Sequence, residues 1–252
     1  MSGKAAKAVT DRAIFLAAAV YQAVQQYKNG GKCILPKGYR KVAVLGGKKD
    51  PYLGMILQSA TTVIIVFRGT ESAAELLTNT DMQQVRFPFV PSAGRTHRGF
   101  TRLYEQAARD SIMRCLRKQS GDKALWIAGH SLGGAIAAMC ALDTAVNSKF
   151  KQPKLYTYAA PKTGDAVFAS AFGRKIRHSV RVVNESDLVP VLPPSLSYAN
   201  YRHVKGAFRL RFSRSTIIGN HTIRSYYQEL AKLDTGYSRR LQQLNPGYCP
   251  ET

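Results

Sequence analysis

The sequence predicts an α/β fold with a mostly parallel central sheet flanked by helices. Apolar runs typical of buried strands alternate with helical patterns through the second half of the chain. These runs are nearly continuous in apolar residues, as in parallel sheets covered on both faces. The chain has 252 residues, of which 45% are hydrophobic, so it can bury one substantial core. We therefore expect a single domain over residues 1–252.

The N-terminal region, residues 1–38, is predicted to be a helical arm. Ile14, Ala18 and Tyr21 follow helical spacing, which predicts an amphipathic helix. Lysines precede the apolar run AIFLAAAV, as in a secretory signal, but Asp11 and Arg12 abut that run and favour the helix. A signal peptide is therefore not evident, which leaves a cytoplasmic or a secreted location open.

The next segments predict strands that lead into a helix. Residues 39–45, 52–58 and 61–67 are rich in β-branched and aromatic residues, and the short polar turn between the last two predicts a hairpin. Residues 99–118 carry apolar side chains at helical spacing. The hairpin should supply one edge of the sheet, and the helix should cover one of its faces.

Strands and helices then alternate. The predicted order is strand 123–129, helix 132–146, strand 154–160, helix 163–172 and strand 178–183. The tail predicts two short strands within 201–213, around Lys205 and Gly206, and a final helix over 222–233. This β/α/β alternation is what predicts parallel strand pairing.

One motif carries the chemistry. Gly129-His130-Ser131-Leu132-Gly133 fits G-x-S-x-G between a predicted strand and a predicted helix, the arrangement of the nucleophile elbow in the α/β-hydrolase fold. The glycines allow strand and helix to approach closely, so the Ser131 hydroxyl projects above the sheet. The alternative is that Ser131 serves only as the N-cap of the following helix, since serine is a favoured N-cap residue.

A serine nucleophile needs a histidine to take its proton and a carboxylate to orient that histidine. In this fold they follow the serine in the order acid, then base. Asp187, after strand 178–183, competes with Asp165, whose place at the start of a helix has an ordinary dipole role. His221, at the start of the final helix, competes with His203 on an expected edge strand. Order and loop placement favour Asp187 and His221.

Six motifs in register resemble the class 3 lipases, the fungal-type triacylglycerol lipases with their bacterial and plant relatives. They are FRGT at 67–70, HRGF at 97–100, GHSLGG at 129–134, YAAPKTGD at 158–165, DLVP at 187–190 and YRHV at 201–204. An ordered set of motifs is far more specific than a lone G-x-S-x-G. The resemblance runs from the hairpin to the final helix and implies an α/β-hydrolase fold.

The resemblance implies the roles of particular residues. It assigns Ser131 as nucleophile, Asp187 as orienting acid and His221 as base. It makes Thr70 and Leu132 the oxyanion-hole residues, and it leaves His203 as a structural neighbour.

The resemblance also implies a lid between FRGT and HRGF, about residues 71–96. Within it, Leu76 and Leu77 are candidate substrate contacts, with packing beneath a loop as the alternative. A leucine, Leu76, stands where the family commonly has tryptophan. Some family members bridge the two ends of the chain, which here would pair Cys33 with Cys249.

These residues predict a serine carboxylic-ester hydrolase that acts on lipid acyl esters through an acyl-enzyme. A phospholipase A, a feruloyl or short-chain esterase, and a silent scaffold with the same fold are the alternatives. No metal-ligand or cofactor motif is present, so neither is expected. No apolar run reaches the roughly 20 residues of a membrane span.

Net charge points to the surfaces the protein would meet. Lys and Arg number 37 against 15 Asp and Glu, a formal charge of +22. Such a chain is attracted to anionic surfaces, so an anionic membrane is a candidate partner, with a merely solvated surface as the alternative. Nucleic acid is a weaker candidate, because no recognition motif accompanies the charge.

Overall fold

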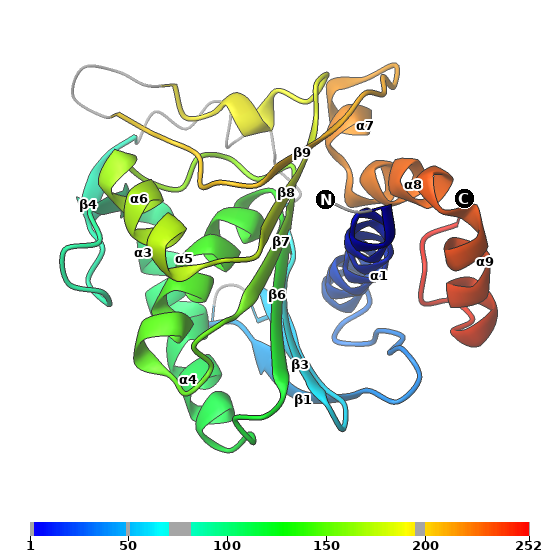
Figure 1. Ribbon diagram of the computed structural model, residues 1–252, viewed down its shortest axis with the longest axis horizontal. Coiled ribbons are helices and arrows are strands. Elements are labelled where there is room, and N and C mark those ends of the chain that lie inside the picture. Colours follow the sequence, from blue (N-terminus) through cyan, green and yellow to red (C-terminus); the bar gives the residue numbers. More distant parts are fainter. Residues whose placement is uncertain (1–2, 49–50, 71–81, 195–199, 252) are drawn as a thin grey trace.

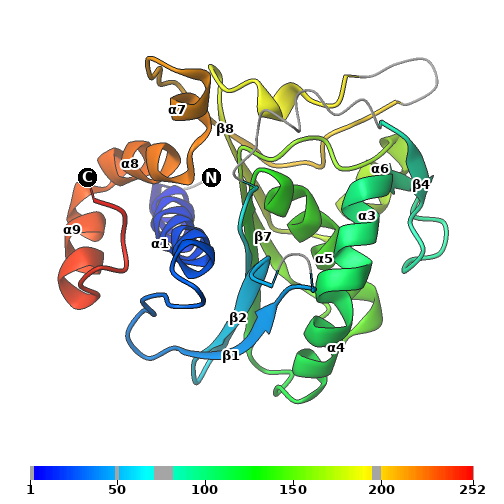
Figure 2. The same cartoon turned by 180° about the vertical axis from the view of Figure 1, so that it is seen from behind.

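A seven-stranded sheet runs through the molecule between two layers of helices (Figures 1 and 2). The computed structural model describes residues 3–48, 51–70, 82–194 and 200–251. The strand order is β1-β2-β3-β6-β7-β8-β9. The strands are β1 Arg40–Leu45, β2 Gly54–Gln58, β3 Thr62–Phe67, β6 Ala124–His130, β7 Lys154–Tyr158, β8 Ser179–Asn184 and β9 Ala207–Leu210.

Strand pairing confirms the predicted mostly parallel sheet. From β3 to β9 every neighbouring pair is parallel. The hairpin predicted from 52–58 and 61–67 is the antiparallel pair β2-β3, and β1 adds a further antiparallel strand at that edge. All six residues of β3 are buried, since helices cover both faces of the sheet there.

The helices divide between the two faces. One face carries α3 Arg98–Tyr104, α4 Asp110–Arg117, α5 Leu132–Asn147 and α6 Ala166–Lys175. The other carries α1 Gly3–Lys28, α8 Ile223–Leu233 and α9 Thr235–Leu244. Each layer packs its own hydrophobic core against the sheet. The helix predicted over 99–118 is therefore α3 and α4, joined by a π-helical turn, Glu105–Arg109.

Helix α1 differs from the expected amphipathic helix. Residues 13–20 are buried on every side, because α1 lies between the sheet and the C-terminal helices (Figure 1). The side-chain amide of Gln22 donates to the carbonyls of Gly247 and Tyr248, which joins the two ends of the described chain. The helix is thus part of the core, while residues 29–38 lead toward β1.

The described part of the candidate lid, residues 82–96, is fixed to the body of the protein. It forms a two-stranded antiparallel hairpin of β4 Gln84–Arg86 and β5 Arg95–His97, which the sequence patterns missed. Phe87 is buried there and packs edge-on against Phe168 at 5.5 Å between ring centroids. Leu76 and Leu77 lie outside the described residues.

Three further expectations, which involve the C-terminal part of the chain, differ from the structure. Only β9 forms a strand within 201–213, and Arg202 makes an isolated bridge to Gly164 instead. The predicted final helix is α8, but α9 follows it. Cys33 and Cys249 are free thiols, so the bridge implied by the resemblance is absent from the structure.

Candidate active site

Ser131 occupies a strained turn between β6 and α5. Its backbone has φ 53° and ψ −129°, a conformation that non-glycine residues rarely adopt and that costs about 1–3 kcal/mol. Its N–H donates to the Tyr158 carbonyl at 2.9 Å, and its side chain makes no capping bond to α5. The hydroxyl is therefore free for another partner, and the N-cap alternative fails.

The glycines around Ser131 are required by backbone packing. A methyl group at Gly129 would collide with the Gly133 carbonyl, and one at Gly133 would collide with the Arg68 carbonyl. Gly134 similarly faces Ala160. The G-x-S-x-G spacing thus lets α5 approach both β6, the strand that precedes it, and the end of β3.

His221 connects the serine to a buried carboxylate. Its Nε2 lies 2.8 Å from Ser131 Oγ, and its Nδ1 lies 3.0 and 2.9 Å from the two Asp187 oxygens. All three side chains are buried. A nitrogen that faces a carboxylate carries the proton, so Nε2 is left as the acceptor for the serine hydroxyl.

Asp187 is held by donors from two elements. The Tyr226 hydroxyl on α8 donates to Oδ2 at 2.8 Å, and the Val189 N–H donates to Oδ1 at 3.0 Å. The same Tyr226 oxygen accepts the Asn184 N–H at the end of β8. These bonds fix the position of the carboxylate beside His221.

His130 positions the backbone that carries His221. Its Nε2–H donates to the His221 carbonyl at 2.5 Å, and the two rings lie 4.8 Å apart between centroids. Burial, together with the neighbouring His221, lowers the pKa of His130 to about 3. The ring is therefore neutral at physiological pH and adds no charge beside His221.

Leu132 directly follows Ser131, and Thr70 directly follows Gly69, where an added Cβ would lie 3.0 Å from the Ser131 Cβ. Leu132 is the first residue of α5, where the N–H has no intrahelical acceptor and the helix dipole favours negative charge. The Thr70 hydroxyl is buried and has no hydrogen-bond partner among the described residues. A buried unpaired hydroxyl is rare and costly, which fits a group reserved for a ligand.

Arg68 fixes the segment that ends in Thr70. Its side chain donates to the Gly69 carbonyl at 2.6 Å and to the Tyr52 carbonyl at 2.8 Å. Its guanidinium also stacks on the Tyr27 ring of α1 at 3.9 Å. The FRGT motif therefore ends in a firmly held turn next to the serine.

The two rival residues have structural roles. Asp165 caps α6 by accepting the Phe168 N–H at 2.7 Å. His203 donates through Nε2 to the Pro190 carbonyl at 2.6 Å, which steadies the loop that follows Asp187. The structure therefore brings Ser131, Asp187 and His221 together and leaves Asp165 and His203 outside that hydrogen-bonded set.

Sequence patterns missed three supporting residues. His130 is the variable position of G-x-S-x-G, Asn184 ends a strand, and Tyr226 lies within a helix. Only His130 stands in a motif, so the sequence carried no separate signal for the other two.

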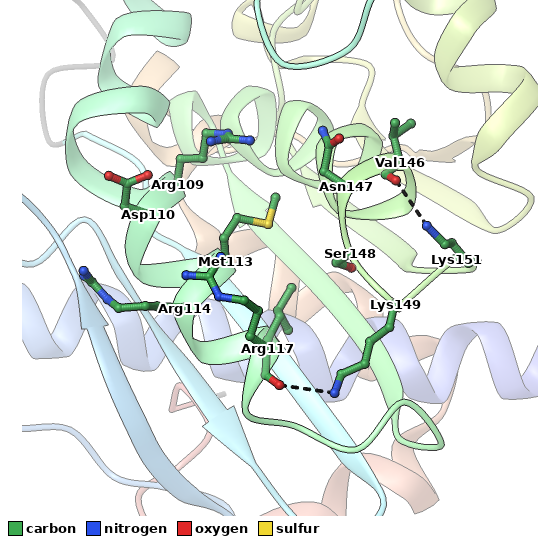
Figure 3. A pocket seen from close by; sticks show the side chains of 11 residues that line it. Arg109, Asp110, Met113, Arg114, Arg117, Val146, Asn147, Ser148, Lys149 and Lys151 are labelled. Atoms are coloured by element: carbon green, nitrogen blue, oxygen red, sulfur yellow. Dashed lines mark hydrogen bonds between the residues drawn. The ribbon is translucent and has the colours of Figure 1, made fainter.

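A cavity larger than any beside Ser131 in the described part of the chain lies elsewhere. A space of about 830 Å³ lies between α4 and the end of α5 (Figure 3). Lys149 and Lys151 line it, and each donates to a helix carbonyl, of Arg117 and Val146 respectively. These segments precede β6 and β7, at the opposite end of the strands from Ser131. Among the described residues, no cluster of His, Cys, Asp and Glu could hold a metal ion.

Comparison with known proteins agrees with this geometry. The model of the family "Lipase (class 3)" matches residues 64–197, more than half of the chain. The chain belongs to the class 3 lipase family. The match begins in β3 and contains Thr70, Ser131 and Asp187.

Individual lipases show how far the similarity extends. A lipase of Rhizomucor miehei is 34% identical over 142 residues, which cover 54% of this chain and 39% of that protein. A secreted mono- and diacylglycerol lipase of Malassezia globosa is 26% identical over 129 residues, covering 46% and 42%. The chain thus spans about 40% of the length of these relatives.

Solved structures of fungal lipases share the fold. The Rhizomucor miehei lipase in complex with its propeptide superposes with a TM-score of 0.70 over 83% of this chain and 69% of that one, at 23% identity. The lipase II of Rhizopus niveus also gives 0.70, over 81% of each chain, at 22% identity. The predicted α/β fold with a mostly parallel sheet is confirmed.

Proposed function

We propose that the protein is a serine carboxylic-ester hydrolase acting on lipid acyl esters. The observation that carries this proposal is the continuous hydrogen-bonded chain from Ser131 Oγ through His221 to Asp187. Family membership supports the reaction class. The catalytic roles of the three residues are part of the proposal.

Acylation begins when Ser131 Oγ attacks the ester carbonyl. His221 Nε2 takes the serine proton, and Asp187 stabilises the imidazolium that forms. The carbonyl oxygen becomes an oxyanion that accepts hydrogen bonds from the N–H groups of Leu132 and Thr70 and from the Thr70 hydroxyl. His221 then gives the proton to the leaving alcohol, which departs and leaves an acyl-serine.

Deacylation repeats the sequence with water. His221 takes a proton from a water molecule as that water attacks the acyl carbonyl, and the same donors stabilise the second oxyanion. Collapse expels Ser131 Oγ, which recovers its proton from His221. The products are a carboxylic acid and the free enzyme.

Exposed apolar side chains around the site favour a lipid substrate. Leu188 and Val191 follow Asp187, while Ile217 and Ile218 precede His221, and each of these residues is between 48% and 68% exposed. Ile217 begins α7, Ile217–His221, and Val191 ends a 3₁₀ turn, Val189–Val191. Exposed apolar groups gathered at a site are typical of surfaces that contact lipid or other apolar ligands.

The test is hydrolysis of p-nitrophenyl esters with acyl chains from two to sixteen carbons, beside Ser131→Ala. We expect activity that disappears in the variant, together with labelling of wild-type Ser131 by an organophosphonate. A preference for long chains would support a lipase, and a preference for the shortest chains would favour an esterase. Labelling without turnover of any ester would contradict the proposal and indicate a silent scaffold.

A further inference from the structure

A small apolar pocket opens beside the triad, between α1 and the segment from α7 to α8. Its volume is about 360 Å³, and His221 and Thr70 form part of its wall. Val24 comes from α1, Ile218 from α7 and Ile223 from the start of α8. The pocket therefore extends from His221 and Thr70 to α1 and α8, two helices that pack together.

Two cations lie at this pocket, and its lining contains no carboxylate among the described residues. Lys28 is the last residue of α1, and Arg224 is the second residue of α8. Glu229, further along α8, is bonded to Arg214 and Lys232. Lys28 already takes part in another interaction, so Arg224, which is exposed, is the cation better placed to meet a ligand.

The chemistry at His221 indicates which part of a substrate lies here. In the proposed reaction His221 protonates the departing alcohol oxygen, so the alcohol part of the ester must lie beside His221. An apolar wall next to His221 would contact the carbon skeleton of that alcohol. A guanidinium further out would face an anionic substituent on it, and arginine pairs with phosphate through two parallel hydrogen bonds.

We propose that this pocket is a head-group subsite in which Arg224 selects acyl esters whose glycerol carries a phosphate. The inference rests on the proposed ester hydrolysis and adds the class of alcohol to it. The phosphate pairs with Arg224 at the wall of the pocket, and the glycerol carbons lie against Ile218 and Ile223. Lys28 adds to the positive potential at the same opening.

The test compares two soluble substrates that differ only in the phosphate, 1-butyrylglycerol and 1-butyrylglycerol 3-phosphate. Because neither aggregates at low concentration, the comparison measures the subsite without a lipid surface. We expect the wild-type protein to have the higher kcat/KM on the phosphorylated ester. Arg224→Gln should lower that value about 5- to 10-fold, mainly through KM, and leave the neutral ester within about twofold, as expected for one charge-assisted contact.

Two further variants separate the subsite from general electrostatics. Arg239→Gln removes the same charge from α9, away from the pocket, and should leave both substrates unchanged. Arg224→Lys keeps a charge but loses the paired hydrogen bonds, so its kcat/KM should be intermediate. Thermal unfolding midpoints equal to the wild-type value would show that each variant is folded.

The outcomes distinguish this inference from the proposed function. The decisive quantity is the ratio of kcat/KM on the phosphorylated ester to kcat/KM on the neutral ester. If both esters are hydrolysed and Arg224→Gln does not change this ratio, or Arg239→Gln changes it equally, the subsite is overturned and ester hydrolysis stands. Absence of hydrolysis of both esters and of p-nitrophenyl butyrate would overturn the proposed function and the subsite with it.

Discussion

Tyr226 joins the carboxylate of Asp187 to the end of β8 through one buried oxygen. Tyr226→Phe removes a donor to Asp187 and leaves the Asn184 N–H without its acceptor. We expect a loss of about 1–3 kcal/mol in the free energy of unfolding, the cost of an unsatisfied buried group. We also expect kcat on p-nitrophenyl butyrate to fall about tenfold as the acid and base lose alignment.

Tyr227 provides the matched control on the same helix. Its hydroxyl bonds to Ser238 at 3.2 Å, away from the triad. Tyr227→Phe should lower stability in urea unfolding while kcat stays near wild type. Equal kcat losses in both variants would mean that Tyr226 acts through general stability and not through Asp187.

Two buried histidines should make stability depend on pH. Burial is the main cause that lowers the pKa of His130 to about 3 and that of His203 to about 4. In the unfolded chain both take up protons below about pH 6.5. The unfolded state then binds more protons, so stability should fall as pH drops from about 6.5 toward 4, by about 1.4 kcal/mol per pH unit for each histidine.

His203→Gln isolates one of these two contributions. Glutamine can still donate to the Pro190 carbonyl but does not titrate. Urea unfolding midpoints at several pH values between 7.5 and 4.5 should give a shallower decline for the variant than for the wild type. Parallel declines would show that His203 does not contribute.

The junction of β3, β6 and α5 depends on a glycine. Gly133→Ala would place a methyl group against the Arg68 carbonyl, which is backbone and cannot rotate away. We expect α5 to be displaced from the FRGT turn, with loss of activity and a lower melting temperature. At Gly173 in α6 an added methyl group would contact no other atom, so Gly173→Ala serves as the control. It should raise the free energy of unfolding by about 0.5–1 kcal/mol, because alanine favours the helix more than glycine does. Wild-type activity in Gly133→Ala would disprove the close approach.

Helix α7 presents an apolar side chain beside the site. Ile218 is 68% exposed and also lines the pocket next to His221. Ile218→Ser should lower activity on emulsified long-chain triacylglycerol several-fold and change hydrolysis of soluble p-nitrophenyl acetate much less, because less apolar surface meets the lipid. Leu244→Ser on α9, with a similarly exposed side chain, serves as control. An equal loss in both variants, or on both substrates, would contradict a lipid-contacting role for α7.

The charge of +22 belongs to the molecule as a whole, and we propose that it draws the protein to anionic membranes. None of the helices in the described ranges combines the length and apolarity of a bilayer span. The inactive variant Ser131→Ala should sediment with vesicles that contain phosphatidylserine and much less with pure phosphatidylcholine. Raising the salt concentration from about 0.05 to 0.5 M should release the protein from these vesicles. The added salt shortens the Debye length from above about 10 Å to a few ångströms and so screens the attraction. Equal binding to both vesicles would contradict the proposal.

Local patterns in the chain determined the sheet, most of its helices and the three residues of the hydrogen-bonded chain. Strand and helix periodicity is a short-range property, and the G-x-S-x-G spacing reflects contacts between neighbouring backbone segments. The order of acid and base along the chain, together with their placement in loops, favoured Asp187 and His221. Their proximity to Ser131 is a consequence of parallel strands, whose carboxyl ends share one edge of the sheet.

Only the tertiary structure decided the surroundings of those residues. The burial of residues 13–20 of α1 on all sides depends on α8 and α9, which lie some 200 positions later in the chain. The bonds of Tyr226 and Asn184 to their partners, and the pocket between α1 and α8, likewise join segments with no local signal. Periodicity records which face of an element is apolar, but which other elements cover it depends on long-range packing.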